Sequence, residues 1–174
     1  MIEARPNLPT DVPVLIAGGG PVGLSTALLL AHHTFRRTGV SIMGKRMFDL
    51  GERMWPEEAP FHTPVFVLTS QAREPWARPG GTTFYFVNDG IESALRQARA
   101  AAGDRDIRIA GGAHAIQQYL RAGLVDEFTL AISPVMFGGG QRLFAGIGHD
   151  VSVELVETIA SPRVTHVRYA VHKP

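Results

Sequence analysis

Ile109-Ala-Gly-Gly-Ala-His-Ala-Ile116 joins two segments of different hydrophobic pattern. The short apolar run at 106–110 predicts a buried strand, and the apolar spacing at 113–121 predicts a helix. Glycines at such a junction let a ligand approach the backbone, and the amides that open a helix attract phosphate. We therefore predict a phosphate-binding turn made of Gly111, Gly112, Ala113 and His114.

A second junction of the same kind is Met43-Gly-Lys-Arg-Met-Phe48, between a predicted strand at 40–43 and a predicted helical turn at 46–50. Here the backbone amides after Gly44 and the cations of Lys45 and Arg46 can converge on phosphate. The simpler alternative is that Lys45 and Arg46 are a solvated pair of surface cations.

A third strand is predicted at 64–70, and polar residues follow its apolar part. The hydroxyls of Thr69 and Ser70, with the guanidinium of Arg73 nearby, suit a phosphate on the 2′-oxygen of a ribose. An ordinary turn at the end of a strand is the alternative for these residues.

The chain also carries Gly18-x-Gly20-x-x-Gly23, between a predicted strand at 12–17 and a predicted helix at 24–33. This context is typical of dinucleotide-binding motifs. The segment closely resembles the start of flavin-dependent aromatic hydroxylases, which implies FAD. However, the motif requires an acidic residue at the end of the second strand, and Lys45 and Arg46 stand there instead. We expect the segment to supply a strand, a turn and a helix; a site for another phosphate-bearing ligand is the alternative.

The second half of the chain changes character along its length. A strand at 82–87 and a helix at 91–102 continue the alternation, but strand-like segments at 126–137, 152–160 and 164–172 then follow with no helix between them. This order predicts an α/β fold whose central sheet is mostly parallel, with antiparallel C-terminal strands at one edge. We expect one domain over 1–174, with a loose lead-in at 1–11 and the flavoprotein-like βα unit at 12–33.

From Gly39 onward the chain resembles the dihydrofolate reductase-like superfamily, and within it the reductase domain of riboflavin biosynthesis. The resemblance is carried by Met43-Gly-Lys-Arg-Met-Phe48, Val65-Phe-Val-Leu-Thr-Ser70, Ile109-Ala-Gly-Gly-Ala-His-Ala-Ile116 with Gln118-Tyr-Leu120, Leu124-Val-Asp-Glu127, and Pro134-Val-Met-Phe-Gly-Gly-Gly-Gln-Arg-Leu-Phe144. It implies a three-layer fold, a homodimer, and NADPH as the donor of hydride to a C=N or C=O carbon. The implied substrate is a small heterocycle or a ribosylamino-pyrimidine.

The same resemblance implies which residues contact the cofactor and which lie near the substrate. It implies that the three predicted turns and Ala17 contact NADPH, and that Gly139, Gly140 and Arg142 lie near the substrate. No catalytic residue follows, because the chain has no Asp or Glu between residues 12 and 39 to donate a proton. Folate reduction is therefore unsupported, and an FAD-binding fragment or a catalytically impaired NADPH-binding protein are the alternatives.

The composition of the chain limits the classes of molecule that we expect it to bind. The formal net charge of +1 gives no case for binding nucleic acid or an anionic membrane. Cysteine is absent, which excludes disulfides and thiolate metal sites, and we expect no metal. The longest apolar stretch, around 24–31, is far shorter than the ~20 residues that cross a bilayer. We expect a cytoplasmic protein whose ligands are small molecules.

Overall fold

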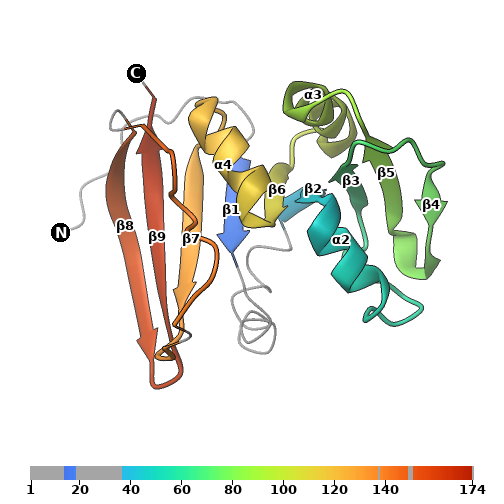
Figure 1. Ribbon diagram of the computed structural model, residues 1–174. Coiled ribbons are helices and arrows are strands. Elements are labelled where there is room, and N and C mark those ends of the chain that lie inside the picture. The colour runs from blue at the N-terminus through green and yellow to red at the C-terminus, as the bar shows by residue number, and fades with distance from the viewer. Residues whose placement is uncertain (1–13, 19–36, 137, 149–150, 174) are drawn as a thin grey trace.

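The computed structural model describes residues 14–18, 37–136, 138–148 and 151–173. These form one nine-stranded sheet in the order β4-β5-β3-β2-β6-β1-β7-β9-β8 (Figure 1). The strands are β1 (Val14–Gly18), β2 (Thr38–Gly44), β3 (Pro64–Leu68), β4 (Trp76–Ala77), β5 (Thr83–Val87), β6 (Asp106–Gly111), β7 (Glu127–Ile132), β8 (Ser152–Ser161) and β9 (Val164–His172). The helices are α2 (Lys45–Glu52), α3 (Ile91–Ala102), α4 (Ala113–Arg121) and the short 3₁₀ helix η1 (Pro79–Gly81).

The direction of the strands confirms the predicted fold class. Strands β5, β3, β2, β6, β1 and β7 run parallel, whereas β9 and β8 are antiparallel at the C-terminal edge. Two details differ from the prediction. Between β3 and β5, where no strand was predicted, the structure contains β4, which adds an antiparallel strand at the other edge. Strand β7 ends at Ile132 rather than at residue 137, and Pro134, which has no N–H to donate, follows within two residues.

Strand β1 occupies an interior position in this sheet. It pairs with β6 through Val14 and Ile107 and with β7 through Leu15 and Glu127, parallel in both cases. Residues 14–18 of the flavoprotein-like segment therefore supply a strand of the central sheet. The predicted helix at 24–33 and the lead-in at 1–11 lie outside the described residues.

One face of the sheet is covered by α3 and α4. Ile107 and Ile109 of β6 pack in a buried cluster with apolar residues of both helices, among them Leu95 and Ile116. The two helices are tied together because the hydroxyl of Tyr119 donates a hydrogen bond to the carbonyl of Ile91 at 2.9 Å. Burial raises the pKa of Tyr119, which keeps this hydroxyl protonated and able to donate.

The opposite face carries α2 and an aromatic cluster, which consists of Phe48, Trp55, Phe61, Trp76, Phe84 and Phe86. Phe48 of α2 lies at its centre, with its ring centroid 5.1 Å from that of Phe84 and 5.2 Å from that of Phe86. Side chains on the two faces alternate along β2, where Ile42 joins the first cluster and Met43 the second. The fold thus has three layers, helix, sheet and helices. No helix in the described ranges is long and apolar enough to cross a membrane.

Candidate functional site

The two predicted glycine turns lie side by side at the ends of neighbouring parallel strands. Met43, just before the first turn, pairs with Gly111 of the second. A Cβ atom built on Gly44 would lie 3.6 Å from the Cβ of Ala115 and 3.9 Å from the carbonyl oxygen of Gly111. Helix α2 begins directly after one turn and α4 directly after the other. The fold therefore brings two helix N-termini together at the carboxyl ends of the parallel strands, which we call the carboxyl edge.

The glycines of the second turn are required for different reasons. Gly111 has a φ of 138°, which side chains rarely allow, and an added Cβ would lie 3.0 Å from Sδ of Met47. A Cβ on Gly112 would meet no described atom within 4 Å. Glycine caps both α2 and α4, so no capping side chain of these two helices accepts their first amides. Among the described residues, no atom fills the space beside Gly112 in front of the first amides of α4, an arrangement that fits a diphosphate.

The cations after Gly44 differ in their surroundings. Lys45 is half-buried and forms an ion pair with Asp49, one turn further along α2. Its Nζ also lies 6.0 Å from the ring centroid of Phe48. Arg46 is exposed at the start of the same helix. The structure thus keeps both cations beside the turn, while Asp49 offsets part of the charge of Lys45.

The third predicted group follows β3, the neighbour of β2. The amide of Thr69 donates to the carbonyl of Val87 at 3.0 Å, and its Oγ1 accepts a hydrogen bond from the amide of Gln71 at 3.1 Å. Ser70, between them, is exposed. Local hydrogen bonds therefore fix this turn and leave Ser70 open to solvent.

Arg73 is more constrained than the sequence suggests. Its Nη2 donates to Oε1 of Glu52 at 2.8 Å, and its guanidinium carbon lies 4.8 Å from the ring centroid of Phe86 and 5.3 Å from that of Trp76. Glu52 ends α2 and is 21 positions away in the sequence, so no local pattern pointed to it. Glu52 is a candidate functional residue that sequence reasoning missed.

The predicted substrate residues Gly139, Gly140 and Arg142 lie in the loop after β7, and this loop is held against α4. The side-chain amide of Gln117 donates to the carbonyl of Arg142 at 2.7 Å, and the guanidinium of Arg121 donates to two further loop carbonyls. The side chain of Arg142 itself is exposed. Ala17 lies in β1, where it pairs with Thr129.

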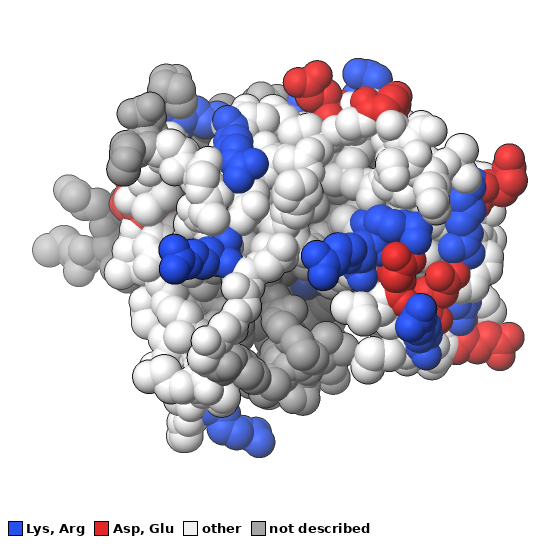
Figure 2. All heavy atoms as spheres, viewed as in Figure 1, with Lys and Arg blue, Asp and Glu red and all other residues white. Residues whose placement is uncertain are grey.

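Charge at the carboxyl edge is mixed rather than uniformly basic. Figure 2 shows basic and acidic side chains side by side over α2, in keeping with the pairs of Lys45 with Asp49 and Arg73 with Glu52. Arg108 lies further from this edge, in the middle of the neighbouring strand β6, and burial lowers its pKa to about 10, so that it remains a cation at neutral pH. Arg108 was not singled out from the sequence.

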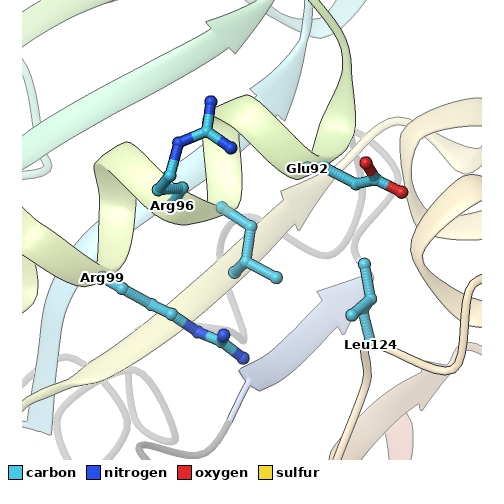
Figure 3. Close-up of a pocket in the computed structure, with 5 residues that line it drawn as sticks. Glu92, Arg96, Arg99 and Leu124 are labelled. Atoms are coloured by element: carbon cyan, nitrogen blue, oxygen red, sulfur yellow. The ribbon is translucent and has the colours of Figure 1, made fainter.

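A pocket beside α3 contains none of the predicted site residues. It is lined by Glu92, Leu95, Arg96, Arg99 and Leu124. Figure 3 shows the guanidinium groups of Arg96 and Arg99 pointing apart rather than toward a shared ligand. The carboxyl edge, where three predicted groups meet, is therefore the better candidate.

Comparisons with known proteins identify the family and the fold of the chain. A family model described as the RibD C-terminal domain matches residues 23–167. The uncharacterized protein YyaP of Bacillus subtilis is 37% identical over 73 residues, which is 42% of this chain and 38% of that protein. The chain thus matches well under half the length of this curated relative.

Two solved structures show the same fold at low sequence identity. RibD of Acinetobacter baumannii superposes with a TM-score of 0.68 at 14% identity, over 94% of this chain and 59% of that one. Dihydrofolate reductase of Enterococcus faecalis superposes with a TM-score of 0.62 at 16% identity, over 93% of this chain and 97% of that one. The family match begins at residue 23, earlier than the resemblance from Gly39, and so includes part of the flavoprotein-like unit. The chain belongs to the RibD C-terminal domain family and has a dihydrofolate reductase-like fold.

Proposed function

We propose that this protein is an NADPH-dependent reductase that binds its cofactor along the carboxyl edge. The observation that carries the proposal is the convergence of the Gly44 and Gly111–Gly112 turns at the starts of two helices. Family membership supports it, and so does the fold shared with a Thermotoga maritima protein that is described as a deaminase and 5-amino-6-(5-phosphoribosylamino)uracil reductase.

The order of the strands suggests which part of NADPH each group of residues binds. The amides after Gly112 and Gly44 hold the diphosphate, and Lys45 and Arg46 offset its charge. On the side of β3, the turn of Thr69 and Ser70 with Arg73 takes the 2′-phosphate. On the other side, β1 with Ala17 and the loop with Gly139, Gly140 and Arg142 face the reactive end.

Bound NADPH supplies a hydride, and the protein supplies position and electrostatics. We assign no residue to proton transfer. The substrate is a small heterocycle or a ribosylamino-pyrimidine that presents a C=N or C=O carbon. The FAD alternative is less favourable because Lys45 follows β2 at the place where the ribose of a dinucleotide needs an acidic partner.

Titration of the purified protein with NADPH tests the proposal directly. We expect quenching of protein fluorescence and a rise in melting temperature that depends on NADPH concentration, because a ligand that binds only the folded state stabilises it. A reductase also has to oxidise NADPH in the presence of a suitable pyrimidine or pterin. No binding at millimolar NADPH would contradict the proposal, and an absorption band near 450 nm that stays with the protein after incubation with FAD and removal of unbound FAD would favour the flavoprotein instead.

We also propose that the partner of this chain is a second copy, bound through β8. All residues of this ten-residue edge strand are exposed except Val156, which is half-buried. Val153 and Leu155 pair with Val171 and Tyr169 on one face, and Ile159 lies on the other. The strand has neither Lys nor Pro, which commonly protect sheet edges, although it does contain one bulge.

Two copies of β8 are compatible with each other. Antiparallel pairing about Val156 and Glu157 would place Glu154 opposite Ile159, so the carboxylates do not face one another. Glu154 and Glu157 are already paired with His172 and Arg168 of β9. The net charge of +1 adds little repulsion between copies.

Leu155→Lys is therefore expected to convert a dimer into a monomer, because it places a charge in the contact. Light scattering would measure masses near twice 18.9 kDa for the wild type and near 18.9 kDa for the variant. Leu50→Lys is the matched control, since Leu50 is 65% exposed on α2, away from β8. A wild type that is monomeric at high concentration, or a Leu155→Lys variant that remains dimeric, contradicts the proposal.

A further inference from the structure

We propose that Glu52 sets the preference of this protein between NADPH and NADH by opposing the charge of Arg73. The inference rests on the proposed NADPH site. It starts from the ion pair in which Nη2 of Arg73 lies 2.8 Å from Oε1 of Glu52. No local sequence pattern singles out Glu52.

The position of Arg73 is fixed from two sides. Its guanidinium carbon lies within 5.4 Å of three ring centroids, those of Phe86, Trp76 and Phe48. Glu52 is held by α2, whose Phe48 is fully buried in the same aromatic cluster. The carboxylate of Glu52 and the guanidinium of Arg73 therefore face each other, because helix α2 and Arg73 both pack against the same aromatic cluster.

The pair remains accessible to a ligand. The side chain of Arg73 is 40% exposed and that of Glu52 is 32% exposed. A guanidinium has five N–H donors, and the bond to Glu52 uses one nitrogen, so others can reach a phosphate. Helix α2 has eight residues and spans about 12 Å. This length separates the diphosphate turn at the start of α2 from Glu52 at its end, so Glu52 lies beside Arg73 rather than beside the diphosphate.

The difference in charge between NADPH and NADH determines how Glu52 affects the binding of each. A phosphate monoester carries about −1.5 to −2 charges at pH 7, whereas the ribose 2′-hydroxyl of NADH is neutral. A phosphate bound by Arg73 would be attracted by the guanidinium and repelled by Glu52. The carboxylate therefore weakens binding of NADPH and leaves that of NADH almost unchanged.

Glu52→Gln tests the inference, because glutamine keeps the shape and removes the charge. We expect the ratio of the NADH to the NADPH dissociation constant to rise about fivefold, as Coulomb's law gives for one charge several ångströms from a phosphate in a solvent-exposed site. A loss of folding would weaken both cofactors equally and would not move this ratio. Glu127→Gln, at the start of β7, is the matched control and should leave the ratio unchanged, because it also removes a carboxylate that is paired with an arginine but lies away from β3.

The double variant Glu52→Gln, Arg73→Gln shows whether Glu52 acts through Arg73. We expect Arg73→Gln to lower the ratio and to reduce the effect of the Glu52 substitution, because the phosphate is then no longer held beside the carboxylate. If the wild type binds NADPH and Glu52→Gln leaves the ratio unchanged or lowers it, the inference is wrong and the proposed function stands. If the wild type binds neither dinucleotide, the proposed function itself is wrong.

Discussion

Gly112→Val is expected to weaken NADPH binding about tenfold to a hundredfold while the protein remains folded. The added side chain enters the open space in front of the α4 amides, where the diphosphate is proposed to lie. Hydrogen bonds to a charged group contribute about 1.5–3 kcal/mol, so the loss of one such contact accounts for an effect of this size. Fluorescence titration with NADPH measures the change, and thermal melting without ligand checks the fold.

Gly148→Val is the control for this substitution. Gly148 also has open space around its Cβ position, and it lies in the loop between β7 and β8, outside the proposed diphosphate turn. Its NADPH affinity should equal that of the wild type. Gly111 would be a poorer test, because its φ of 138° and the nearby Met47 couple any substitution to stability. Unchanged NADPH affinity in Gly112→Val would show that the diphosphate does not lie at this turn.

Phe48→Ala is expected to lower the free energy of unfolding by about 3–5 kcal/mol, as for other buried phenylalanines. Phe48 is fully buried, and it is the only residue of α2 with a buried side chain in the described structure. Its loss would leave a cavity among four aromatic rings and would loosen the helix that carries Lys45 and Arg46. Urea denaturation measures the change in stability.

Leu50→Ala provides the comparison on the same helix. Leu50 is exposed, so its truncation should change the free energy of unfolding by no more than about 0.5 kcal/mol. If Phe48→Ala costs as little as Leu50→Ala, then α2 is not anchored through the aromatic cluster. In that case the pairing of Glu52 with Arg73 would also lose its structural basis.

Local sequence patterns were sufficient to predict helices and strands that are defined by a single segment of the chain. The apolar spacing predicted α3 and α4 with the bounds that the structure has, and it predicted β9 in the same way. The glycine junctions were also visible locally, because each follows a strand and opens a helix. The sequence could not show that the turns after Gly44 and Gly111 touch, since this depends on β2 and β6 being neighbours.

The features that the sequence did not predict, strand β4 and the pairing of Glu52 with Arg73, depend on interactions between distant segments. Strand β4 has two residues and exists only by pairing with β5, so its own sequence carries almost no signal. Glu52 meets Arg73 because the aromatic cluster packs α2 against the loop after β3. The roles proposed for the site residues, NADPH as cofactor and the dimer remain predictions.

The interior position of β1 has a consequence for how the chain folds. Its partners begin with Ile107 and Glu127, which are made about a hundred residues later during synthesis. In the described sheet, β6 and β7 do not pair with each other and are joined through the five residues of β1. Contacts of such long sequence separation form slowly, because the intervening loop must close first. Until β7 leaves the ribosome the two halves of the described sheet remain separate, and β1, although it precedes the other described strands in the chain, is among the last of them to find its place.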